Sequence, residues 1–134
     1  MTGLPDALLL FAHGARDPRW AEPFRAVAAQ VAQAMPEVRV ALAFLELMTP
    51  DLPTAVNDLA GAGARRVRVV PLFLGQGGHV REDLPRLVDA VRARHPELVV
   101  ELALAAGEAP AVLDALAAYC MAQAAPQSVE GDRR

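Results

Sequence analysis

Four short apolar runs, separated by longer amphipathic segments, predict four buried β-strands. The runs cover 7–12, 38–45, 66–74 and 98–104, and Val, Leu and Ala dominate them. Uninterrupted apolar runs of this length are typical of strands that are covered on both faces. Each run ends at turn-forming or polar residues, so the strands are expected to end there.

The segments between the runs predict helices, because their apolar residues recur at steps of three and four. In the second helix, Thr49 or Asp51 is the expected cap, and Gly61 marks the end. In the third, Pro85 is expected near the first turn, so that regular helix is expected only from there. In the fourth, Val112, Leu113, Leu116 and Tyr119 are the residues available for packing. The helices are expected at 19–35, from the cap at 49 or 51 to 61, at 80–94 and at 109–123.

The alternation of strands and helices predicts an α/β fold. We expect a single three-layer domain in which a four-stranded parallel sheet, with right-handed connections, is flanked by helices on both faces. The strand order 2-1-3-4 is one possibility. The domain is expected to cover 1–124, and the polar segment 125–134 is expected to be a disordered tail.

Composition narrows the possible partners and the compartment. A net charge of −3 and a predicted pI of about 5.5 argue against a general nucleic-acid binder. The apolar runs are too short to cross a membrane. A single cysteine, Cys120, cannot form an internal disulfide, and it is expected to be packed on the last helix. These features predict a cytoplasmic protein.

Two histidines and a glutamate follow successive predicted strands. His13 follows the first strand, Glu46 follows the second, and His79 follows the third after a glycine loop. Because the carboxyl ends of parallel strands lie at one edge of a sheet, these side chains are expected to converge. Imidazole and carboxylate groups suit a divalent ion such as Co²⁺, Fe²⁺, Ni²⁺ or Zn²⁺, and three donors leave coordination positions open. The same imidazoles could accept protons near neutral pH.

Each of these residues also has an ordinary structural interpretation. A histidine after a strand is often a hydrogen-bonded loop residue, and Glu46 could be a solvated strand end. His95, before Pro96, is expected to be a solvated helix C-terminus, where a cation is favoured. Glu101 is expected to point outward from its strand.

Arginines and a glycine-rich loop flank the two histidines in the sequence. Arginine side chains suit carboxylates, although ordinary surface charge explains them equally well. The glycine loop lacks the Gly-Lys-Ser/Thr ending of a phosphate-binding loop. The candidate substrate-binding residues are Arg16, Arg19, Gly75, Gln76, Gly77, Gly78 and Arg81.

Three segments together resemble a known family. Residues 8–18 are similar to the opening strand and His-Gly-Ser/Ala turn of the class II tetrapyrrole chelatases. Residues 69–74 followed by 78–85 resemble their second signature, and 43–46 matches a glutamate that some members use. The resemblance is greatest to the short, single-domain CbiX-type sirohydrochlorin cobaltochelatases and ferrochelatases. It runs from Leu8 to Tyr119, and it departs from the family pattern at Ala15 and in the loop at 76–77.

The resemblance implies a chelatase-like domain, corresponding to half of the two-lobed chelatases. It implies insertion of Co²⁺ or Fe²⁺ into sirohydrochlorin on the route to cobalamin or siroheme, and some small relatives act on Ni²⁺. His13 and His79 would be metal ligands and proton acceptors, with Glu46 as a third participant. The metal is a substrate, and no prosthetic group is implied. A homodimer is implied, since one lobe cannot enclose a cleft.

Two other functions remain compatible with the same residues. A carrier would bind metal or tetrapyrrole without catalysing insertion. A phosphoryl-transfer enzyme could use His13 and Gly14 with the arginines, but it would leave His79 and Glu46 without a role.

Overall fold

Four parallel strands form one sheet in the order β2-β1-β3-β4. The computed structural model describes residues 3–75 and 77–126, without the side chains of Gly78 and His79. The strands are β1 (Ala7–Ala12), β2 (Arg39–Phe44), β3 (Arg66–Pro71) and β4 (Val99–Leu102). The predicted α/β class, the parallel sheet and the strand order are confirmed. Residues 127–134 of the predicted tail lie outside the described residues.

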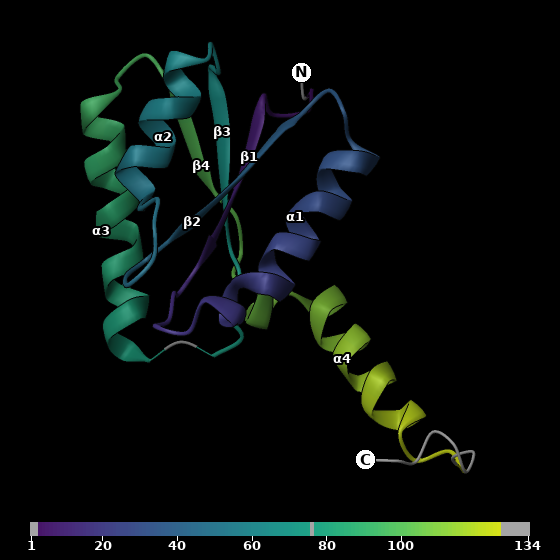
Figure 1. Cartoon of the computed structure of the whole chain (residues 1–134). Helices are drawn as coiled ribbons and strands as arrows, with labels where there is room; N and C mark the ends of the chain where they lie inside the picture. Colours follow the sequence, from purple (N-terminus) through teal and green to yellow (C-terminus); the bar gives the residue numbers. More distant parts are fainter. Residues whose placement is uncertain (1–2, 76, 127–134) are drawn as a thin grey trace.

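Helices cover the two faces of the sheet unequally (Figure 1). A short 3-10 helix, η1 (Pro18–Ala21), leads into α1 (Glu22–Ala34), which packs on β2. The helices α2 (Leu52–Gly61) and α3 (Gly78–Arg94) lie on the opposite face. Another 3-10 helix, η2 (Ala106–Glu108), precedes α4 (Pro110–Ala122).

The main core lies between the sheet and the α2–α3 layer. Alternate residues of the two central strands point into it, where they meet the apolar faces of both helices. The fully buried members include Leu9, Phe11, Val56, Val69 and Val88. A smaller cluster under η1 and α1 contains Ala12, Ala21 and Phe44. Burial of these surfaces, at about 25 cal/mol per Å² of apolar area, is the main force that holds the layers together.

Local capping explains where α2 begins. The Asp51 carboxylate accepts a hydrogen bond from the Thr54 N–H at 2.9 Å, and a proline follows in the first turn. Hydrogen bonds from the side chain and the N–H of Thr54 hold the pKa of Asp51 below its ordinary value. Of the two predicted caps, Asp51 is therefore the one used. The predicted end at Gly61 is confirmed.

The third helix differs from the prediction. It begins at Gly78, and Pro85 lies inside it instead of near its start. Proline removes one helical hydrogen bond, which normally ends or bends a helix. Here Leu84, Val88 and Val91 are buried against the sheet. Their packing favours a helix that continues through the proline.

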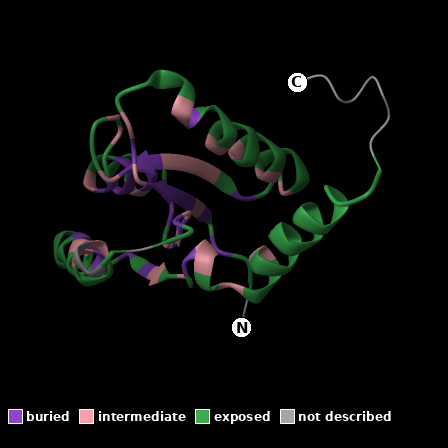
Figure 2. Ribbon diagram, turned by 90° about the horizontal axis from the view of Figure 1, so that it is seen from below, coloured by how far each residue is buried: buried purple, intermediate pink, exposed green. Residues whose placement is uncertain are grey.

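The fourth helix is not packed as expected. No residue of α4 is buried, and the helix extends away from the sheet (Figure 2). Leu113, Leu116 and Tyr119, which the sequence offered for packing, are exposed. Cys120 is exposed as well, so the prediction that it is packed is wrong. Helical periodicity cannot tell whether a partner surface lies within the same chain.

Two further surface predictions have mixed outcomes. His95 caps the end of α3, but its side chain is only 16% exposed, and Nε2 lies 2.8 Å from Oδ1 of Asn57. The expectation of a solvated histidine is therefore wrong. Glu101 points to the α1 face, where it forms an ion pair with Arg68 at 2.9 Å.

Within residues 3–75 and 77–126, none of the helices combines the length and the apolar composition that a membrane crossing requires.

Candidate functional site

The site begins where β1 and β2 run past their last paired residues. The Leu45 N–H donates to the Ala12 carbonyl at 2.9 Å, and the Glu46 N–H donates to the His13 carbonyl at 3.1 Å. The backbone ladder therefore continues into both loops. It brings His13 and Glu46 side by side at the carboxyl edge, although 33 positions separate them.

The side chains of His13 and Glu46 are in direct contact. Nε2 of His13 lies 3.1 Å from Oε2 of Glu46, and the two side chains are 45% and 54% exposed. The pair is therefore accessible from solvent. The predicted convergence of these two residues is confirmed.

The spacing of this pair suits one shared metal ion. Two ligand atoms that lie about 2.1 Å from an ion and about 90–110° apart are separated by about 3.0–3.4 Å. The distance between Nε2 of His13 and Oε2 of Glu46 falls in this range. Without metal, the two groups satisfy each other by a hydrogen bond. The spacing of the pair is therefore compatible with coordination of one ion by both atoms.

A glycine makes this close approach possible. Gly14 has a φ of +99°, and a Cβ at this position would lie 1.8 Å from the carbonyl oxygen of Glu46. Glycine alone tolerates both the backbone conformation and the contact. On the other side of the pair, Leu47 has a φ of +66°, which residues with a Cβ seldom adopt. The sequence places Gly14 in the turn after the first strand, but its contact with Glu46 is visible only in the fold.

On its other flank, His13 meets the segment that leaves β3. The Leu72 N–H donates to the Phe11 carbonyl at 2.8 Å, so β3 also extends beside β1. The buried Phe73 ring lies 6.1 Å from the His13 ring, centroid to centroid, at 68°. This edge contact supports one side of the imidazole. The sequence analysis assigned Phe73 no such role, because its apolar run reads equally well as core.

The predicted partner histidine follows this same segment. The backbone of His79 lies in the first turn of α3, at the carboxyl end of β3. Its side chain lies outside the described residues, so its distance from His13 stays a prediction. Among the side chains that are described, no group of three metal-ligating residues occurs.

A second glycine braces the β3 loop from the side of β4. The Gly107 N–H donates to the Phe73 carbonyl at 2.8 Å, and a Cβ on Gly107 would lie 1.7 Å from the Leu74 carbonyl oxygen. The connection after β4 therefore fits closely against the loop that leads to His79. Nothing in the residues around Gly107 indicates this contact from the sequence alone.

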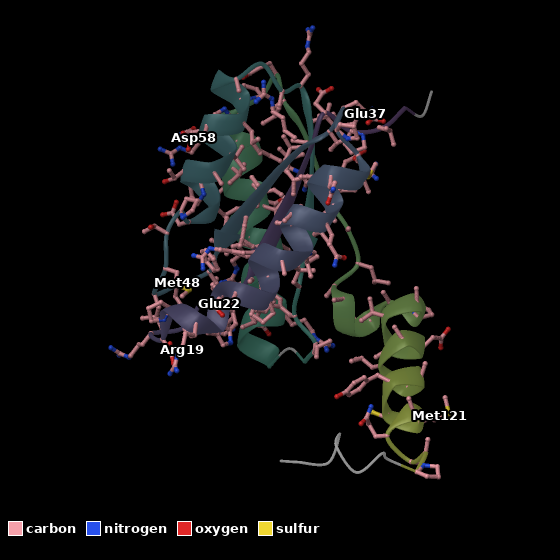
Figure 3. All side chains as sticks on the ribbon, turned by 45° about the vertical axis from the view of Figure 1, so that its right-hand side comes forward. Arg19, Glu22, Glu37, Met48, Asp58 and Met121 are labelled. Carbon is pink, nitrogen blue, oxygen red and sulfur yellow. The ribbon has the colours of Figure 1, made fainter. Side chains whose placement is uncertain are left out.

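The predicted arginines differ in their surroundings. Arg19 forms two hydrogen bonds to Asp17, at 3.1 Å from Nε and 2.8 Å from Nη2, and points away from the sheet (Figure 3). Hydrogen bonds from the Arg19 side chain and N–H lower the pKa of Asp17, and the pKa of Arg19 is raised in return. A substrate carboxylate would have to compete with Asp17 for this guanidinium. Arg16 and Arg81 are exposed, near the ends of β1 and β3.

The glycine loop is described in part. Gly75 and Gly77 are exposed, and Gly77 is the N-cap of α3. Gln76 lies outside the described residues, and Gly78 is described only by its place at the start of α3. The substrate-binding role expected for this loop and for the arginines stays a prediction.

An open hollow of about 310 Å³ lies between α3 and the end of β2. Leu45, Asp83, Arg86, Leu87 and Ala90 line it, and apolar surface dominates. None of the predicted site residues is among them, although Leu45 precedes Glu46 in the chain. The hollow is therefore separate from the His13–Glu46 pair.

Comparisons with known proteins identify the family of this chain. The CbiX family model matches residues 7–121. A sirohydrochlorin cobaltochelatase of Methanocaldococcus jannaschii is 34% identical over 90 residues, covering 67% of this chain and 63% of that protein. Another, from Methanothermobacter thermautotrophicus, is 32% identical over 81 residues, covering 60% of this chain and 56% of that protein. The chain thus matches less than two thirds of the length of these relatives.

A solved structure matches over nearly its whole length. A candidate cobalamin biosynthesis CbiX protein from Marinobacter aquaeolei is 34% identical with a TM-score of 0.78, covering 89% of this chain and 97% of that chain. The fold and the strand-end positions of His13, Glu46 and His79 lie within the residues that the family model matches. This chain belongs to the CbiX family.

Proposed function

We propose that this protein is a chelatase that inserts a divalent metal ion, Co²⁺ or Fe²⁺, into sirohydrochlorin, in cobalamin or siroheme biosynthesis. The curated relatives named above are sirohydrochlorin cobaltochelatases. The observation that carries the proposal is the accessible contact between Nε2 of His13 and Oε2 of Glu46, at a spacing that one metal ion can bridge. Ni²⁺ is a further candidate metal.

The chemistry assigns different tasks to the residues of the site. Metal insertion must remove water from the ion and two protons from the pyrrole nitrogens. His13, Glu46 and His79 hold the ion weakly at the carboxyl edge, and the open coordination positions allow it to transfer. As the metal leaves, the neutral imidazoles accept the pyrrole protons. Glu46 then accepts a hydrogen bond from the protonated His13.

Substrate orientation falls to the cationic groups around this edge. Sirohydrochlorin carries several carboxylates, and guanidinium groups bind carboxylates through two parallel hydrogen bonds. Arg16 and Arg81 are exposed near the strand ends and take this role. Arg19 joins them by exchanging its contact with Asp17 for one with a substrate carboxylate. The glycine loop at 75–78 leaves room for the macrocycle.

The active form is a homodimer in the cytoplasm. SirB from Bacillus subtilis is similar to this chain at 26% identity and a TM-score of 0.71, over 92% of this chain but only 49% of that chain. This chain therefore corresponds to about half of that protein, which supports an active form in which a second copy supplies the other half. A cleft between two copies would hold the macrocycle beside the metal, where one carboxyl edge alone leaves it exposed.

Multiple-turnover insertion tests the proposal. Purified protein at one twentieth of the sirohydrochlorin concentration is supplied with Co²⁺, Fe²⁺ or Ni²⁺ in parallel, and the visible spectrum is followed against protein-free controls. We expect an initial rate proportional to protein concentration and many products per chain with at least one metal. Product that stops at one per chain would indicate a carrier. A rate equal to the protein-free rate would contradict the proposal.

A further inference from the structure

The fourth helix is an apolar element without a partner in its own chain. Among its 13 residues, Asp114 is the only charged one, and no residue of the helix is buried. Its exposed large side chains include Leu113, Leu116, Tyr119 and Met121. Figure 3 shows Met121 far from the sheet, with the helix extended from the rest of the molecule. Helices that are apolar around most of their circumference are normally buried.

A matching bare surface lies on the sheet. Val67, Val69 and Val100 point into the core beneath α2 and α3, so the alternation of strand side chains turns their neighbours to the α1 face. There α1 packs on β2 and leaves the half formed by β3 and β4 open. Val99 on this half is 48% exposed. The half-exposed pair of Arg68 and Glu101 lies beside it.

We propose that α4 packs on the open β3–β4 half of a second copy of this chain, and that the two copies exchange their α4 helices. This inference rests on the proposed homodimer and names the contact that forms it. The helix starts from a fixed point, because η2 is held to the β3 loop by the hydrogen bond from Gly107 to Phe73. From there α4 extends away from its own sheet, so it can reach a second copy without a change in its direction (Figure 1).

The area available is enough for a specific contact between two copies. A fully buried aliphatic side chain removes roughly 60–120 Å² of apolar surface from water, and an aromatic one at least 150 Å². The large apolar residues of one α4 are 40–68% exposed in the single chain, so covering them buries about 280 Å². The surface that they cover contributes a similar area. Two exchanged helices bury roughly 1,100 Å² in total, just above the area of about 1,000 Å² that a specific interface should exceed.

Charge and position agree with the same partner. The receiving half carries Arg66 and Arg68 against Glu101, which leaves it one positive charge in excess, and α4 carries Asp114 alone. The helix departs from the carboxyl edge, where His13 and Glu46 lie. The second copy is therefore held next to the candidate site. An α4 that exchanges would also help to enclose the cleft that one copy lacks.

Light scattering after size-exclusion chromatography tests the contact, at 1 to 100 μM protein. We expect wild type to be a dimer and a Leu113→Glu/Leu116→Glu double variant to be a monomer. Both residues lie outside the two cores, so circular dichroism should show an unchanged fold. Leu4→Glu, at an exposed apolar residue preceding β1, is the matched control and should stay dimeric.

The outcomes separate this contact from the dimer itself. A wild-type monomer at every concentration would overturn both the exchange and the proposed homodimer. A double variant that stays dimeric would overturn the exchange and leave the homodimer standing. A monomeric wild type that binds anionic lipid vesicles through α4 would overturn the exchange in favour of a membrane surface.

Mixing two variants tests the exchange against simple pairing of two α4 helices. The Val99→Glu change places a charge on the receiving half, so this variant should also be a monomer or a much weaker dimer. In a mixture with the α4 double variant, one helix and one receiving face are both intact. We expect mixed dimers that are tighter than either variant alone. A Val99→Glu variant that dimerises like wild type would contradict the exchange.

Discussion

Gly14→Ala should separate the two halves of the candidate site. The new Cβ would lie 1.8 Å from the Glu46 carbonyl oxygen, and contacts under 3.0 Å essentially never occur. The loop that carries Glu46 must therefore retreat by at least 1.2 Å. The retreat weakens the hydrogen bond from the Glu46 N–H to the His13 carbonyl, which is 3.1 Å long.

The cost of this change has two parts. A residue with a Cβ at a φ of +99° is strained by about 1–2 kcal/mol. Loss of the hydrogen bond between the loops adds about 1 kcal/mol. We expect the free energy of unfolding to fall by about 2–3 kcal/mol, which most single domains survive. If the protein inserts metal as proposed, a displacement of about 1 Å at the reacting groups should slow insertion by about 100-fold.

Gly63→Ala is a matched control. Gly63 has a nearly identical φ of +101°, but no atom lies within 4 Å of the position its Cβ would take. It should lose about 1–2 kcal/mol of stability from strain alone and keep the wild-type insertion rate. Urea unfolding and the visible spectrum of sirohydrochlorin measure the two effects. Equal stability losses in the two variants, with wild-type insertion by Gly14→Ala, would refute the reasoning.

Three further changes test other parts of the structure. Asp51→Ala should lower the free energy of unfolding by about 1 kcal/mol at pH 7. The pKa of Asp51 is lowered in the folded protein, so its contribution to the free energy of unfolding is complete above its unfolded pKa of about 3.9 and is lost as the pH falls further. The difference in free energy of unfolding between wild type and Asp51→Ala, measured in urea, should therefore narrow below about pH 4. Gly107→Ala should push back the Leu74 carbonyl, which lies 1.7 Å from the position of the new Cβ, and should reduce both stability and insertion; unchanged values for both would contradict the bracing role. Val88→Ala, at a fully buried position, should cost about 2 kcal/mol in the same unfolding assay with no effect on insertion per folded chain.

Local pattern predicts much of this fold. The apolar runs locate all four strands, and Asp51 and Gly61 delimit α2, because capping and strand burial depend on neighbouring residues in the chain. The first helix is predicted at 19–35, although its first turn, η1, forms a separate 3-10 segment. The strand order agrees with the expected order because a parallel sheet with right-handed connections allows few arrangements.

The predictions that are wrong concern features that depend on tertiary contacts. Pro85 should break a helix, yet packing around it holds α3 together from Gly78. Leu116 has the spacing of a packed residue and the sequence predicts that Cys120 is packed, but no part of the described chain covers either side chain.

The candidate site shows the same division. Strand-end logic predicts that His13 meets Glu46, since both follow neighbouring parallel strands. It cannot predict that Gly14 must be a glycine, that Phe73 supports the imidazole or that Asp17 engages Arg19. Each of these depends on the path of a loop, which no periodicity encodes.

The central claim is that His13 and His79 act together on one metal ion, and the chain has three histidines with which to test it. The initial rate of Co²⁺ insertion into sirohydrochlorin should be measured for His13→Ala, His79→Ala and His95→Ala. His95 is held by Asn57 away from the carboxyl edge, so it is the matched control. The account predicts that both site variants lose at least 100-fold while His95→Ala keeps its rate once corrected for folded protein. Wild-type insertion by His79→Ala would contradict it.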